Sequence, residues 1–198
     1  MSAFGRVRIG FSLPWVATYV NTNGTISYTG GMRLARGVEV NLSPETSEDN
    51  NFYCDNGIGE SENGKFSGGT LSLTCDDPLP EAKALVEGTS TADTNGWVKH
   101  TDENVRPYVG IGWIVTYLSD GVKSYVPTLV RKCRLTSIAD EASTKEDEVS
   151  YQTSAQEYEL FRDDSTDHAW KWVNEAGFST EAAAEAALKT ALGVTVTT

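Results

Sequence analysis

Alternation between apolar and polar residues dominates the pattern along this chain. Segments 6–11, 38–42 and 70–75 each alternate an apolar side chain with a polar residue or glycine. A period of two is typical of β-strands with one face buried. Two further short strands are predicted at 15–20 and 25–29, because the Asn-Thr-Asn-Gly run between them favours a tight hairpin turn. The pattern therefore predicts an antiparallel, mainly β fold.

The longest predicted strands lie in the third quarter of the chain. Residues 107–118 and 122–138 are predicted as two strands joined by a Ser-Asp-Gly turn at 119–121, and 148–162 as another strand. Strands of this length overhang any core that a chain of this size can build. We therefore expect them to lie against another copy of the chain, which favours self-assembly over chemistry.

Two segments have the features of helices. Residues 77–88 carry proline early and glycine at the end, the asymmetry expected of a short helix. Residues 179–193 are rich in alanine, with Ser179 as the expected N-cap and glycine at the end. We expect Leu188 and Leu192 to dock this second helix on the sheet, since a short helix is marginal alone.

A long polar, acidic and glycine-rich segment spans 43–65. Its expected anchors are Phe52, Tyr53 and Ile58. Structureless loops beyond about 15 residues are uncommon in compact domains and are usually functional or disordered. The aromatic pair favours a loop that docks on another surface. A second polar stretch, 88–104, is predicted as a surface excursion.

Composition predicts one domain spanning residues 1–198, since no segment is typical of an interdomain linker. The chain has 18 glycines for turns and 19 aromatic residues for a core. Its net charge is −12, from 28 acidic and 16 basic residues, which argues against strong nucleic-acid binding because that relies on lysine and arginine. Neither a signal peptide nor an apolar stretch of 18 or more residues is evident. We expect a protein that is made and stays soluble in a cytoplasm, without membrane association.

The residues that could carry catalysis or bind metal are sparse. Cys54, Cys75 and Cys133 are widely spaced and are interpreted as free thiols. His100 and His168 are expected to be exposed in polar loops, and neither lies near a nucleophile motif. We expect no enzyme activity, no cofactor and no metal.

Three further features allow more than one interpretation. Residues 163–168 could form a divalent-metal loop, but they lack the glycine and terminal glutamate of the calcium pattern, and a strand-to-helix turn fits better. Gly110 and Gly112 lie within a strand pattern, where glycine indicates a bulge or a close backbone approach rather than a phosphate loop. Trp97, in a polar stretch, is the candidate for an exposed contact such as a sugar.

An ordered set of segments resembles the major tail protein of long-tailed bacteriophages. The set covers roughly residues 35–160, and no single motif in it is specific. Its members are the Phe-Tyr-Cys-Asp run at 52–55 after a strand ending in Leu-Ser-Pro-Glu, the Gly-Gly-Thr-Leu-Ser-Leu run at 68–73 with a short helix, the Pro-Tyr-Val-Gly-Ile-Gly-Trp run at 107–113 with its hairpin, and the 132–145 segment running into Val-Ser-Tyr-Gln-Thr at 149–153. Cys54 stands where alanine is expected in the family.

The resemblance implies a tail tube protein. Such a protein has an antiparallel β-sandwich or barrel fold with a flanking helix and a long inter-subunit loop. Its hexameric rings stack into a hollow tube through which the genome passes without specific binding. The implied partners are copies of itself, the tape measure protein, and the tail terminator or baseplate proteins. The implied location is the virion tail, assembled in the cytoplasm of a bacterial host.

The resemblance also indicates which residues meet neighbouring subunits. It assigns the bridging role to the 43–65 loop and places the strand at 148–162 in the tube wall. The candidate interface residues are Glu45, Asp49, Phe52, Tyr53, Asp55, Ile58, Val149 and Tyr151.

Two other functions remain open at this stage. A distal tail or tail terminator protein would share the fold but form single rings. A carbohydrate-binding β-sandwich would use Trp97 and nearby acids. Polymer formation separates the tube from the ring proteins, and loss of glycan binding on Trp97→Ala would support the third function.

Overall fold

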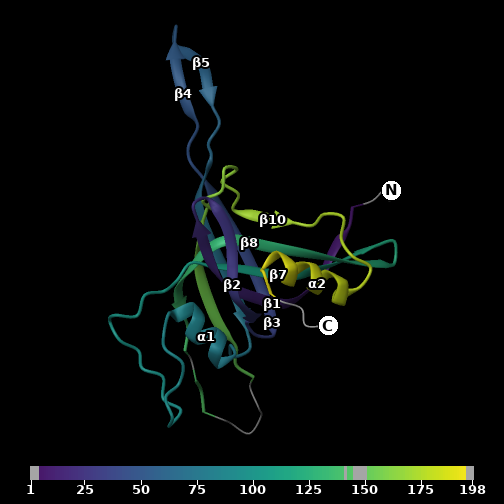
Figure 1. The fold of residues 1–198 in the computed structure, drawn as a ribbon. Helices are drawn as coiled ribbons and strands as arrows, with labels where there is room; N and C mark the ends of the chain where they lie inside the picture. Colours follow the sequence, from purple (N-terminus) through teal and green to yellow (C-terminus); the bar gives the residue numbers. More distant parts are fainter. Residues whose placement is uncertain (1–4, 141, 145–150, 195–198) are drawn as a thin grey trace.

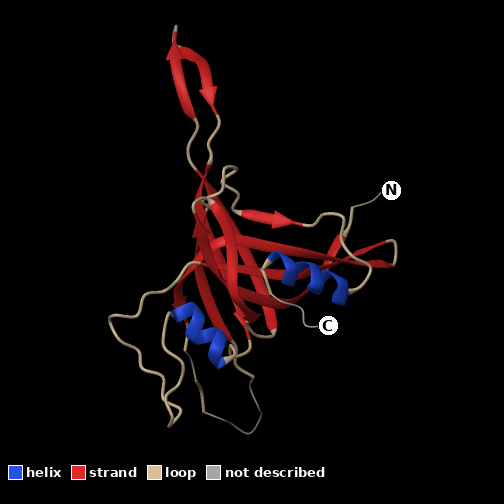
Figure 2. Cartoon of the chain, in the orientation of Figure 1, coloured by secondary structure: helices blue, strands red, loops and turns tan. Residues whose placement is uncertain are grey.

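The structure is a computed structural model that describes residues 5–140, 142–144 and 151–194, and within these ranges the chain is mainly β with two short helices (Figures 1 and 2). The strands are β1 (Val7–Thr22), β2 (Thr25–Arg33), β3 (Gly37–Thr46), β4 (Asn50–Cys54), β5 (Gly57–Glu62), β6 (Phe66–Cys75), β7 (Val109–Ser119), β8 (Val122–Ile138), β9 (Ser154–Phe161) and β10 (Lys171–Val173). The helices are α1 (Pro80–Glu87) and α2 (Glu181–Ala191).

Eight of the strands form one antiparallel sheet. Its order is β2-β1-β7-β8-β9-β6-β3, and β10 also pairs with β8. β8 is long enough to hold two neighbours along one edge, β10 at residues 128–130 and β9 at 132–138. Strands β4 and β5 form a separate two-stranded sheet. The predicted mainly β, antiparallel class is confirmed.

Each face of the sheet supports its own core. Val16, Ile111 and Tyr158 belong to the larger core, which also takes in α1. Ala17 and Ile114 point the other way and belong to a second core beneath α2. Because side chains alternate along a strand, adjacent residues of β1 supply opposite cores. The two helices therefore pack against different faces of the sheet.

The long strands β7 and β8 largely match their predicted ranges, but the third long strand does not. β9 begins at Ser154, whereas 148–162 was the expected range. Its neighbours end at Cys75 and Ile138, so residues 151–153 have no strand to pair with. Residues 145–150 lie outside the described part of the chain.

The predicted turns follow from residues that tolerate a left-handed backbone. Asn23 and Gly24 have φ values of 52° and 84°, and Asp120 and Gly121 have values of 49° and 79°. Two consecutive positive φ angles define the hairpin turn whose twist matches that of the flanking strands. Both predicted hairpins are confirmed.

Both helices form where expected, with one correction at a cap. Gly88 ends α1 in the left-handed region, as its position predicts. The N-cap of α2 is Thr180 and not Ser179, because the Thr180 hydroxyl accepts a hydrogen bond from the backbone N–H of Ala183. Leu188 and Leu192 are buried on the sheet, so the predicted docking is confirmed.

The paired glycines of β7 allow close packing. A Cβ atom at Gly110 would lie 2.5 Å from the ring of Tyr28, and one at Gly112 would lie 2.4 Å from Cδ1 of Leu188. The interpretation of these glycines as points of close approach is confirmed. None of the helices in the described ranges is long and apolar enough to cross a membrane.

Candidate functional site

The segment expected as a long loop is instead a β-hairpin that projects from the body of the molecule (Figure 1). We call residues 46–65 the arm; it continues β3 and β6 outward through β4 and β5. The turn at its tip is formed by Asp55 and Asn56, with φ values of 47° and 63°. The Asp-Asn-Gly run at 55–57 is a hairpin signal that the loop prediction overlooked.

Polar contacts define the neck of the arm. The backbone N–H of Ser47 donates to the carbonyl of Lys65 at 2.8 Å, and the N–H of Gly64 donates to Oδ1 of Asp49 at 2.7 Å. A Cβ atom at Gly64 would lie 1.9 Å from the Ser47 carbonyl oxygen, so only glycine fits there. Of the candidate interface residues, Asp49 thus holds the neck together, and Glu45 lies on β3 opposite Gly68.

Large apolar side chains at the tip of the arm face solvent. Phe52, Tyr53 and Ile58 are 65%, 68% and 58% exposed. Tyr53 and Ile58 are directly paired across the hairpin and share one face, while Phe52 and Cys54 lie beside Gly59 on the other. Neither core of the described residues includes these three large side chains. Since a two-stranded hairpin alone is marginal in water, the tip is expected to gain stability when another surface covers it.

Of the remaining two candidate interface residues, Tyr151 alone lies in the described part of the chain. Tyr151 is 91% exposed and lies in no strand, so its predicted place in the sheet is wrong. Val149 lies outside the described residues.

A pocket of about 440 Å³ opens at the base of the arm. We call it the basal pocket; its lining residues are Phe66, Ser67, Lys132, Phe161, Arg162 and Asp164. Phe66 is the first residue of β6 and follows the arm directly. Its ring stacks on Trp170, with 4.7 Å between centroids. The pocket combines aromatic walls with two basic side chains.

Beside the pocket, cations and aromatic rings alternate over the surface of β8 and β9. The rings of Tyr108 and Phe161 meet edge to face at 5.2 Å. Nζ of Lys132 lies 4.7 Å from the Tyr108 centroid, and the guanidinium of Arg134 lies 5.4 Å from both rings. Such cation–π contacts are worth about 0.5–1 kcal/mol each at exposed sites. They keep the long basic side chains ordered next to the pocket.

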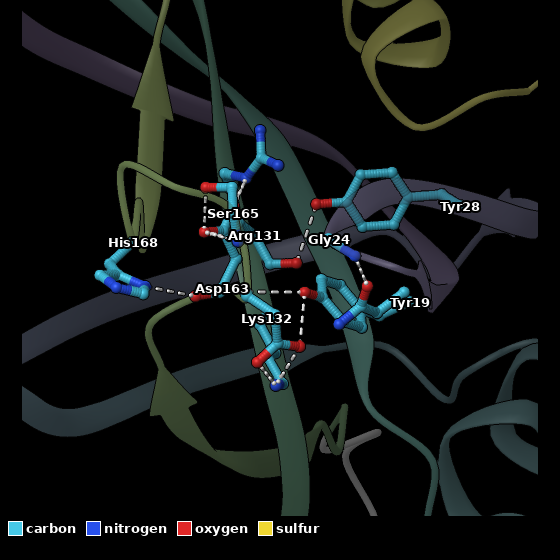
Figure 3. A network of polar contacts seen from close by, with 10 residues as sticks. Tyr19, Gly24, Tyr28, Arg131, Lys132, Asp163, Ser165 and His168 are labelled. Atoms are coloured by element: carbon cyan, nitrogen blue, oxygen red, sulfur yellow. Dashed lines mark hydrogen bonds and ion pairs between the residues drawn. The ribbon is translucent and has the colours of Figure 1, made fainter.

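A bulge in β8 explains why two consecutive basic residues both form ion pairs with the β9–β10 connection. Val109 pairs with Cys133 but Ile111 pairs with Val130, so β8 contains one extra residue at 131–132. Arg131 and Lys132 then reach the adjacent carboxylates Asp163 and Asp164 respectively (Figure 3).

Arg131 and Asp163 form a buried ion pair. Their side chains are only 5% and 0% exposed, and Nε lies 2.5 Å from Oδ2. Oδ1 of Asp163 accepts the backbone N–H of Ser165 at 3.1 Å, and the Arg131 guanidinium stacks 3.6 Å from the ring of Trp172. The carbonyl of Arg131 accepts the Tyr28 hydroxyl at 2.8 Å. This network ties the β9–β10 connection to the sheet.

Lys132 and Asp164 extend the network to the surface. Nζ of Lys132 donates to both carboxylate oxygens, at 3.0 and 2.8 Å, and the Tyr19 hydroxyl donates to Oδ2 at 2.9 Å. The bond from Lys132 lowers the pKa of Asp164 below its ordinary value. Burial raises the pKa of Tyr19 to about 12, so its hydroxyl stays a donor at neutral pH.

The 163–168 segment therefore has a structural explanation that uses its acids. Asp163 and Asp164 pair with basic side chains, and no three residues of the ligating types cluster in the described ranges. The segment connects β9 to β10, so the expected strand-to-helix turn is a strand-to-strand connection.

The remaining residues considered in the sequence are the exposed Trp97, the two histidines and the three cysteines. Trp97 is exposed in the 88–104 excursion, and His100 and His168 are exposed as expected. All three cysteines are free, with only Cys54 exposed.

Comparison with known proteins adds no identification. No protein-family model matches the chain, and no curated protein matches it.

Proposed function

We propose that this chain is a structural subunit that assembles with copies of itself into stacked hexameric rings, forming the tail tube of a long-tailed bacteriophage. The observation that carries the proposal is the arm, whose apolar tip is exposed on both faces. The resemblance to major tail proteins supplies the tube and the virion tail. On this proposal the protein performs no catalysis and contacts the tape measure and terminator or baseplate proteins.

The exposed apolar tip of the arm has a free-energy cost in an isolated monomer. Burying one large apolar side chain is worth about 1.5–3 kcal/mol, and the tip presents three of them. Soluble monomers rarely leave a projecting apolar group of this kind uncovered. A second copy that covers the tip would recover this free energy, so the arm favours assembly over an isolated monomer.

Open strand edges give a second reason. β2 and β3 end the sheet order, so each has one edge without a strand partner among the described residues. Unpaired edges favour association with another chain. A closed ring of identical subunits provides such pairing without open growth.

The test removes the arm without disturbing the sheet. Thr46 and Phe66 are cross-strand partners, so replacing residues 47–65 by Asn-Gly closes β3 and β6 with a two-residue turn. Electron microscopy and light scattering at high concentration should show hollow tubes or stacked rings for the wild type and a folded monomer for the variant. Normal tubes from the armless variant would refute the assigned role. Trp97→Ala, which changes another exposed aromatic, is the matched control and should still assemble.

The two alternative functions predict other outcomes. Single rings of the wild type that do not stack would favour a distal tail or terminator protein. Glycan binding by the wild type that Trp97→Ala abolishes would favour a carbohydrate-binding module, because the exposed indole offers a flat apolar surface for a sugar.

A further inference from the structure

We propose that the arm tip of one copy docks in the basal pocket of a second copy, an inference that rests on the proposed assembly function. The occupant is thus a defined segment of the same chain. Three observations carry it: complementary charge, complementary apolar surface, and the positions of tip and pocket at opposite ends of the arm.

The arm is acidic and its acids are largely uncommitted. Residues 46–65 contain five acidic residues and a single lysine. Within the described part of the chain, the one ion pair in the arm joins Glu62 to Lys65. Asp55 and Glu60, at the tip, form no ion pair in that part of the chain. The apolar tip is therefore flanked by free carboxylates.

The basal pocket offers the opposite charge. Arg162 is exposed at the pocket and enters no ion pair in the described ranges. The second basic lining residue, Lys132, is paired with Asp164. The lining therefore has a net charge of +1, in a chain with a net charge of −12. The unpaired guanidinium of Arg162 suits a carboxylate placed beside an aromatic ring.

The pocket also suits an aromatic side chain. Phe66 and Phe161 form its apolar walls, and its volume of about 440 Å³ admits a ring of the size of Phe52 or Tyr53. A ring that enters would contact the rings of Phe66 and Phe161, and aromatic pairs gain free energy beyond that of burial alone.

An arm cannot reach the pocket of its own copy. The tip lies about nine residues beyond the neck, which at about 3.3 Å per residue is roughly 30 Å. Figure 1 shows the hairpin extending away from the body, while the pocket residues lie at its base. The contact is therefore head-to-tail between copies and repeats along the arm. It predicts an axial repeat on the order of 30 Å in the assembly.

A larger groove is the rival docking surface. It measures about 590 Å³ and lies between β3, β7 and β10, with Trp113 and Val115 among its apolar lining residues. Its charges are mixed, because Arg8 and Lys171 line it together with Glu39 and Glu175. The basal pocket is favoured because its two basic residues face one acid, whereas the two basic residues of the groove face two acids. Cross-linking distinguishes the two sites.

Cys54 makes the test direct, because it is the one exposed thiol and lies at the arm tip. Ser67→Cys places a second exposed thiol in the basal pocket, and Asn41→Cys places one in the rival groove. Each full-length variant is treated with a short bismaleimide and analysed by denaturing gel electrophoresis. The proposal predicts dimers and a ladder of longer species for Ser67→Cys only. Linkage of Asn41→Cys instead, or tip-to-tip linkage in the wild type, would overturn it.

Charge reversal tests the electrostatic part. Added to Ser67→Cys, Arg162→Glu should reduce the yield of linked dimer about fivefold at low salt, whereas Arg162→Lys should retain most of it. An unchanged yield with Arg162→Glu would refute the role of charge in docking.

The outcomes also separate this inference from the proposed function. Tubes that form without linkage at Ser67→Cys would support the tube function and overturn the docking site. Linkage at Ser67→Cys without tubes or stacked rings would support the docking site and refute the tube. A monomer that shows neither would overturn both.

Discussion

Replacing Asp163 by asparagine should destabilise the fold far more than a typical surface change. The substitution keeps the size of the side chain but removes the charge that faces Arg131 in a site where both side chains are almost fully buried. An unpaired buried guanidinium costs about 3–5 kcal/mol. For a chain of this length that corresponds to a fall in melting temperature of roughly 6–20 °C.

The assay is urea unfolding followed by tryptophan fluorescence, at one fixed low protein concentration so that assembly does not shift the equilibrium. The matched control is Glu159→Gln, which breaks the exposed pair with Arg134, whose side chains are 42% and 47% exposed. That pair should contribute about 0–1 kcal/mol.

A double-mutant cycle completes the test. Arg131→Met combined with Asp163→Asn leaves no buried charge and keeps a side-chain oxygen that can accept the Ser165 N–H. The double variant should therefore be less destabilised than the sum of the two single variants. The reasoning would be refuted if Asp163→Asn cost less than about 1 kcal/mol, or if the two single changes simply added.

Three other outcomes are expected. Leu188→Ala should lower the free energy of unfolding by about 2–5 kcal/mol in the same assay, because it empties the contact of α2 with the sheet; a loss below 1 kcal/mol would show that α2 is not docked. The Lys132 contact lowers the pKa of Asp164, so its stabilising effect is present above the ordinary value of 3.8 and is lost as the pH falls through the lowered value. The stability difference between wild type and Asp164→Asn should therefore shrink in acid, and a difference that grows would contradict the assignment. A maleimide should label Cys54 alone at neutral pH and all three thiols in urea, since the other two are buried; labelling of more than one thiol in the folded chain would contradict that burial.

Local signals in the sequence determined most of the individual elements. The alternation at the end of β6 follows its one buried face, and a positive φ at Asn23 or Gly88 depends on residues adjacent in the chain. The alanine content of α2 predicts a helix, although the predicted N-cap, Ser179, lies one residue before the actual N-cap, Thr180. Such features are visible because the interactions that create them are local.

The tertiary structure alone decided where strands begin and which charges meet. The start of β9 depends on where its partners end, since a strand without a neighbour loses its ladder hydrogen bonds. The pairing of Arg131 with Asp163 depends on the β8 bulge, and nothing in either local segment specifies it.

The arm combines features that its sequence predicts with features that depend on the tertiary structure. Its polar composition predicted exposure and its aromatic residues predicted a contact surface, but the loop prediction missed the hairpin that extends β3 and β6. The sequence determined what the tip carries. Only the fold decided that tip and basal pocket lie at opposite ends of one arm, because that separation is set by strand pairing between residues distant in the chain.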